Sequence, residues 1–116
     1  MTWTIPFIPP SLNKFAGREN VWAYRAEKER WKEICAAFIR PRPKTPPQFA
    51  DVRITFYFPN KIRHDADNYL KFLLDGLVFT GAIADDSFDA ITLTVEGKHD
   101  KKNPRTEIEI NERRKT

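Results

Sequence analysis

The sequence predicts an α+β fold in which two helices pack on a small mixed β-sheet of about four strands. Apolar residues recur at helical spacing in residues 19–39 and 67–80, and they alternate at strand spacing in four other segments. The segments follow one another in the order β-α-β-α-β-β, which is typical of a sheet covered by helices. A length of 116 residues fits one domain, so we expect residues 1–116 to form a single unit.

The first half of the chain predicts an edge strand and a long helix. TWTIPFI alternates, and Pro6 places it at a sheet edge because proline cannot donate a ladder hydrogen bond. The turn PPSLNK follows, and residues 19–39 then form a helix that the prolines of PRPKTPPQ end. The helix should bury Trp31, Ile34, Cys35, Phe38 and Ile39, and expose Lys28, Glu29, Lys32 and Glu33.

The second half predicts three strands and a second helix. Residues 50–59 alternate most strongly, with one face made of Val52, Ile54, Phe56 and Phe58. A helix then runs from about Asp67 to Thr80, and Gly81 is a typical C-terminal cap. Two further strands are expected at residues 88–97 and 106–110, before a basic tail.

The composition favours an ordered protein with no membrane partner. Hydrophobic residues make up 41% of the chain and aromatic residues 13%, which is enough for a core. No apolar stretch approaches the roughly 20 residues of a spanning helix, and MTWTIPFIPP lacks the basic start of a signal peptide. Cys35 is the only cysteine, so no internal disulfide can form. We therefore expect a cytoplasmic protein.

The net charge of +4 is unevenly distributed. Residues 1–50 carry nine Lys/Arg and four Glu, a balance of +5; residues 51–96 carry four Lys/Arg and eight Asp/Glu, a balance of −4. Residues 97–116 carry seven Lys/Arg and four Asp/Glu, a balance of +3. Basic ends suit a polyanion such as DNA, but an acidic middle would repel phosphate unless it held a cation. For any single lysine, a solvated surface role is the commoner one.

Four aspartates flank the second helix. Asp65 and Asp67 lie at its start, and Asp85 and Asp86 follow its end. Two routes would bring Asp86 close to Asp67. In the first, the segment GAIADD turns back. In the second, the next strand pairs beside the 50–59 strand, and the end of one strand meets the start of its neighbour. Converging carboxylates would bind Mg²⁺ or Mn²⁺, and such a site can polarise a phosphodiester and activate water.

A purely structural interpretation of these aspartates stays open. Aspartate is a favoured helix N-cap, so Asp65 or Asp67 would start the helix. Asp85, Asp86 and Ser87 together have the composition of a simple turn. Spacing alone does not choose between these roles and metal binding.

Several basic and polar residues near the aspartates are candidate site residues. Lys71 lies four residues after Asp67 on the same helix face, where it contacts a scissile phosphate or forms a salt bridge with Asp67 or Asp75. Candidate DNA contacts, for which turn and loop roles are the alternative, are Asn13, Lys14, Lys61, Arg63 and His64.

These motifs resemble the RusA family of Holliday junction resolvases, found in bacteria and their phages. The resemblance is carried by PPSLNK, DADNYLKFLLDGL and GAIADD, and it spans most of the chain, with a looser match over residues 19–50. The family pattern is Asp-x-Asp-Asn, a lysine four residues beyond the second Asp, then Asp-x-Leu, Gly and Asp-Asp. It is matched in order and spacing by Asp65, Asp67, Asn68, Lys71, Asp75, Leu77, Gly81, Asp85 and Asp86.

The resemblance implies an endodeoxyribonuclease that resolves four-way DNA junctions by paired hydrolysis, with Mg²⁺ as cofactor and Mn²⁺ as a substitute. It implies that Asp65, Asp67 and Asp86 hold the metal and that Lys71 is an essential basic residue. It implies a homodimer and no small-molecule cofactor. A two-fold symmetric dimer also suits a junction that needs paired nicks on opposed strands.

The resemblance also bears on the DNA contacts. Asn13 and Lys14 fall where the family has an N-terminal turn near the DNA. Family members often carry a basic residue directly before the first Asp, whereas this chain has His64 there, with Arg63 one step earlier. This difference from the family pattern affects the positive charge available for DNA contact more than it affects metal binding.

Two other functions remain as alternatives. The basic ends would suffice for a non-catalytic protein that binds branched DNA. The acidic set weighs against it, because a pure binder gains nothing from carboxylates beside phosphate. The third hypothesis is an α+β scaffold whose acids only cap helices and turns.

Overall fold

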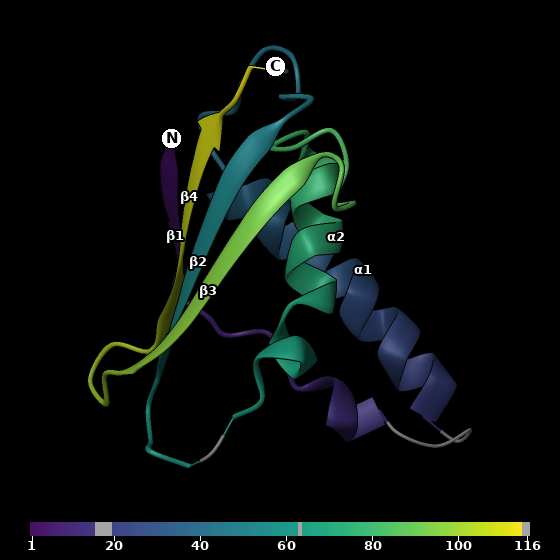
Figure 1. Cartoon of the computed structure of the whole chain (residues 1–116). Helices are drawn as coiled ribbons and strands as arrows, with labels where there is room; N and C mark the ends of the chain where they lie inside the picture. Colours follow the sequence, from purple (N-terminus) through teal and green to yellow (C-terminus); the bar gives the residue numbers. More distant parts are fainter. Residues whose placement is uncertain (16–19, 63, 115–116) are drawn as a thin grey trace.

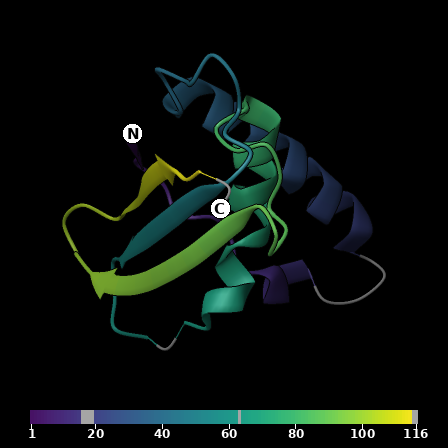
Figure 2. The ribbon, with the colours of Figure 1, turned by 45° about the horizontal axis from the view of Figure 1, so that its top comes forward.

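A four-stranded mixed sheet carries both helices on one face (Figures 1 and 2). The computed structural model describes residues 1–15, 20–62 and 64–114. The strands, in the spatial order β1-β4-β2-β3, are β1 (Thr2–Ile5), β4 (Arg105–Glu112), β2 (Ala50–Phe58) and β3 (Ile91–His99). β2 pairs with β3 in parallel, whereas β4 is antiparallel to both β1 and β2. The predicted fold class is confirmed.

Two α-helices and two short 3-10 turns complete the described chain. The helices are α1 (Val21–Phe38) and α2 (Lys71–Thr80), and the turns are η1 (Leu12–Phe15) and η3 (Ala66–Tyr69). Because both helices cover the same face, the other face of the sheet is open (Figure 2). None of the described helices combines the length and the apolar character that crossing a membrane requires.

The second predicted helix is divided in two. The expected segment from Asp67 to Thr80 begins as the 3-10 turn η3, in which the Asn68 N–H donates to the Asp65 carbonyl at 3.1 Å, and α2 starts only at Lys71. Asp and Asn favour such local turns over a helix interior. Gly81 ends α2 as predicted, with a left-handed φ of 80° and its N–H bonded to the carbonyls of Leu77 and Val78.

The core lies between the sheet and the helices. The inner face of β2 is buried as predicted, and the largest buried helix side chains are Trp31, Phe72, Leu73 and Leu77. Phe38, expected in the core, is 37% exposed, because it lies in the last turn of α1 and packs edge-to-face on Phe7 at 6.0 Å. The sheet and helices therefore share one core that fixes α2 against β2.

The two helices approach each other closely at Gly76. A Cβ at this position would lie 2.4 Å from Cys35 Sγ and 3.0 Å from Cys35 Cβ, so only glycine fits. Burial raises the pKa of the Cys35 thiol to about 12, and the neutral thiol packs as an apolar group. This contact holds α1 beside α2, where the charged residues described below face one another.

The parallel pairing of β2 and β3 decides where the aspartates lie. Ala50 pairs with Ile91 and Phe58 with His99, so the starts of the two strands are adjacent. The expectation that the end of one strand meets the start of its neighbour is wrong, because α2 carries the chain back along the sheet before β3 begins. Asp65 therefore follows the end of β2, whereas Asp86 precedes the start of β3, which lies beside the start of β2.

Candidate functional site

Asp65 and Asp67 lie on the surface just beyond the end of β2. Asp65 is extended (φ −87°, ψ 126°) and directly precedes η3, and Asp67 lies inside η3; both residues are exposed. Asp65 occupies the N-cap position of η3 but makes no side-chain capping hydrogen bond, and Leu70 is the N-cap residue of α2. The helix-cap interpretation therefore gains no support from either aspartate.

His64, the residue before Asp65, is held in an aromatic cluster. The His64 ring stacks on Phe58, with centroids 3.9 Å apart and an interplanar angle of 6°. Its Nδ1 lies 2.8 Å from the Tyr69 hydroxyl and its Nε2 lies 3.2 Å from Asn60 Oδ1. Because Phe58 ends β2 and Tyr69 ends η3, His64 ties the acidic segment to the sheet. Its predicted DNA contact stays a prediction.

The turn η1 brings two predicted DNA contacts to the same end of the molecule. Asn13 and Lys14 are exposed, and η1 packs near η3 (Figure 1). Phe15 anchors η1 through an edge contact of 5.8 Å with Phe72. Lys61 is exposed in the loop after β2, and Arg63 lies outside the described residues.

Lys71, at the start of α2, pairs with Asp75 rather than with Asp67. Its Nζ lies 3.3 Å from Asp75 Oδ1, in a pair whose side chains are 49% and 19% exposed, respectively. Among the described residues, the buried Asp75 Oδ2 has no hydrogen-bond partner. A buried carboxylate oxygen without a partner costs stability.

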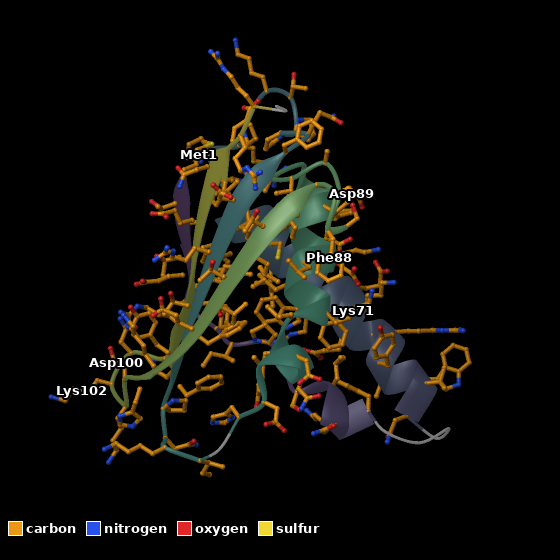
Figure 3. The ribbon with its side chains drawn as sticks, viewed as in Figure 1. Met1, Lys71, Phe88, Asp89, Asp100 and Lys102 are labelled. Atoms are coloured by element: carbon orange, nitrogen blue, oxygen red, sulfur yellow. The ribbon has the colours of Figure 1, made fainter. Side chains whose placement is uncertain are left out.

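A hollow beside α2 collects charged residues from three segments; we call it the α2 hollow. It is lined by Lys28 and Lys32 of α1, by Asp75 and Phe79 of α2, and by Asp85 and Asp86. The loop after Gly81 thus turns back along α2, and Figure 3 shows its Phe88 and Asp89 on the same side as Lys71. Asp85 Oδ1 accepts the Asp86 N–H at 2.9 Å, whereas the hydrogen-bonded turn of this loop lies at residues 87–90 rather than at Asp85–Ser87.

The predicted ligands are distributed over the two ends of α2. Asp86 shares the α2 hollow with Asp75, whereas Asp65 and Asp67 lie at the η3 end. A ten-residue helix is about 15 Å long. Within residues 1–15, 20–62 and 64–114, no three His, Cys, Asp or Glu side chains are grouped to hold a metal ion. Their shared metal role therefore stays a prediction.

The chemistry of the donors nevertheless suits a hard divalent cation. Carboxylate oxygens are the ligands that Mg²⁺ and Mn²⁺ prefer. Asp75 and the exposed Asp86 line the same hollow, and the buried Oδ2 of Asp75 has no hydrogen-bond partner among the described residues. These two residues fit one side of a cation site.

The sequence did not indicate that α1 contributes to this region. Lys28 and Lys32 were expected to face water, but they are half-buried and line the α2 hollow. A signal existed, because Arg25, Lys28 and Lys32 recur at helical spacing. The sequence could not show that this stripe faces α2, because that depends on the close approach at Gly76.

The comparison with protein families identifies a family for this chain. The sequence pattern of the family described as endodeoxyribonuclease RusA matches residues 6–111. This range covers the strands β2 and β3, both helices and every aspartate discussed above. No curated protein matches the chain. The family match confirms the resemblance, and the chain belongs to the RusA family of endodeoxyribonucleases.

Proposed function

We propose that this protein is a Mg²⁺-dependent endodeoxyribonuclease that resolves Holliday junctions by paired phosphodiester hydrolysis, in DNA recombination and repair. The observation that carries the proposal is the RusA family match over residues 6–111, which includes the whole acidic motif. The α2 hollow supports it, because carboxylates and lysines line one surface there. That combination suits a phosphodiester and a cation bound side by side.

In this proposal Asp65, Asp67 and Asp86 hold Mg²⁺, and Mn²⁺ can substitute. A bound Mg²⁺ would polarise the scissile phosphodiester and activate the attacking water. Because α2 separates the η3 end from the α2 hollow, assembly of this set would draw the loop that carries Asp86 along α2 towards Lys71. Metal and DNA bound together would offset the repulsion between the carboxylates.

Lys71 offsets the charge that develops on the phosphate. Its ion pair with Asp75 is long, at 3.3 Å, and its side chain is half exposed. Because the Lys71 ammonium group is exposed, it can contact a phosphate oxygen while it stays near Asp75.

The DNA contacts in this proposal are Asn13, Lys14, Lys61, Arg63 and His64. We place the protein in the cytoplasm, as a homodimer on branched DNA. Two copies related by a two-fold axis would present two equivalent sites to the two strands that must be nicked. The basic ends of the sequence supply the attraction for the phosphate backbone.

The test compares wild type with Asp67→Asn on a synthetic four-way junction and on a linear duplex of the same sequence. Wild type should introduce paired nicks in the junction with Mg²⁺, and Asp67→Asn should bind the junction without cutting it. Asp51→Asn is the matched control, because Asp51 is exposed on β2 and pairs with Arg113 at 3.2 Å. Equal cutting by wild type and Asp67→Asn would refute the metal role.

A non-catalytic branched-DNA binding protein is the second candidate. It is favoured by one observation, that the described residues contain no assembled group of three metal-binding side chains. This candidate predicts junction binding by wild type with no cutting in either Mg²⁺ or Mn²⁺. The same assay therefore separates the two functions.

A further inference from the structure

One face of α1 carries basic residues towards the α2 hollow. Arg25, Lys28 and Lys32 lie at helical spacing on this helix, and the two lysines line the hollow that contains Asp86. Both lysines are half-buried, so their positions are limited by the packing of α1 on α2. They belong to a different helix from every DNA contact proposed above.

The interactions of the two lysines leave charge available. Lys32 Nζ lies 3.3 Å from Glu29 Oε1 and 5.5 Å from the centre of the Phe79 ring, which directs it towards α2. Within the described chain, no hydrogen bond or ion pair engages the ammonium group of Lys28. Lys28 is therefore a half-buried cation with no ion-pair partner among the described residues.

The aspartates of the hollow do not pair with Lys28 or Lys32. Within the described residues, neither lysine forms an ion pair with any of the three aspartates, and the nearby pairs are Lys71 with Asp75 and Lys32 with Glu29. Lysines that served only to neutralise these aspartates would be expected within ion-pair distance of them. A bound anionic group would pair with the lysines directly, and with the aspartates through a bridging cation.

We propose that Lys28 and Lys32 bind backbone phosphates of the DNA strand that is cut, next to Asp86. This inference rests on the proposed function. Residues four apart on a helix are about 6 Å apart along its axis, and one DNA strand carries a phosphate about every 3.4 Å of helix axis. The spacing of the two lysines therefore suits nearby phosphates of one strand. They hold this strand beside α2, on the surface that Asp86 lines.

The test measures junction affinity as a function of salt concentration, in EDTA so that the DNA stays intact. Lys28→Ala and Lys32→Ala should each weaken binding roughly five- to tenfold at 0.1 M salt and lower the slope of log K against log salt by about 0.9. Lys28→Arg should keep the wild-type slope. Arg53→Ala is the matched control, because Arg53 lies outside the basic ends and is exposed on the open face of β2.

The outcomes separate this inference from the proposed function. Wild-type binding with unchanged slopes for Lys28→Ala and Lys32→Ala would overturn the inference alone. A rise in Mn²⁺ affinity in these variants without a change in slope would also overturn it, because it would mean that the lysines act only on the aspartates. Failure of wild type to bind the junction would overturn both.

Discussion

Two charged regions of this protein differ in how their charges are satisfied. At the β3–β4 turn, Arg105 lies 2.9 Å from both Asp100 and Glu107, and its guanidinium group stacks 3.7 Å over the Tyr57 ring. In the α2 hollow, Asp75 pairs with Lys71, but its buried Oδ2 has no hydrogen-bond partner among the described residues. The charges of Asp100, Arg105 and Glu107 are thus paired with one another, whereas those of the hollow are only partly paired. A charge cluster indicates function more strongly when its members are incompletely paired.

The pKa values of Asp100 and Arg105 agree with this internal pairing at the turn. The hydrogen bond from Arg105 lowers the pKa of Asp100, and hydrogen bonds to Glu107 and Asp100 raise the pKa of Arg105. Both shifts stabilise the charged forms in the folded state. These charges therefore belong to the fold, and their removal should affect stability rather than catalysis.

Of the three substitutions described next, His64→Ala is expected to have the largest effect. It tests whether the contacts of His64 hold the acidic segment in position for cleavage. Loss of the stack on Phe58 and of the contact with the Tyr69 hydroxyl frees the segment that carries Asp65. Junction cleavage should fall about 10- to 100-fold, as for other residues that orient ligands. Junction affinity in EDTA should fall much less than cleavage, because the other proposed DNA contacts remain. An equal loss of affinity and of cleavage would mean that His64 acts through its DNA contact alone.

An intermediate effect is expected for Gly76→Ala, which disturbs the helix contact that forms the α2 hollow. The added Cβ overlaps Cys35 Sγ at 2.4 Å, and overpacking of this kind costs about 2 kcal/mol. Chemical denaturation should show this loss of unfolding free energy. Adding Cys35→Ala should restore part of it, because the overlapping sulfur is removed. Wild-type stability for Gly76→Ala alone would mean that the helices do not pack this closely.

The smallest effect is expected for Arg105→Ala, in the region whose charges are internally paired. The folded-state pKa of Asp100 is lowered, so its contribution to stability is present above the unfolded value of about 3.9 and is lost as pH falls through the lower folded value. Arg105→Ala should therefore lower the melting temperature slightly at pH 7 and less at acid pH. Cleavage should be unchanged. A large loss of cleavage would remove the distinction between the two regions.

The sequence predicted the fold because its periodicity is strong. The alternation of residues 50–59 and the helical spacing of the apolar residues in α1 and α2 determined the elements and their faces. Residues 88–90 were predicted as part of β3 but lie in a turn, in which the Ala90 N–H donates to the Ser87 carbonyl at 3.0 Å. Local hydrogen bonds of this kind compete with strand pairing, and periodicity does not report them.

The arrangement of the site was less predictable because it depends on tertiary packing. The motif named the aspartates and Lys71, but the sequence allowed two routes for Asp86 and did not fix the direction of β3. The parallel pairing excluded one route, and the α2 hollow shows that the loop turns back along the helix. The role of His64 in tying Asp65 to β2 required the ring positions of Phe58 and Tyr69.

The most direct test of the account compares Asp86→Asn with Asp100→Asn in cleavage of a four-way junction with Mg²⁺. Both changes remove one carboxylate charge, one from the α2 hollow and one from the Arg105 network. The account predicts that Asp86→Asn cuts at least about 100-fold more slowly than wild type, and that Asp100→Asn cuts at the wild-type rate. Cutting by Asp86→Asn at the rate of Asp100→Asn would contradict it.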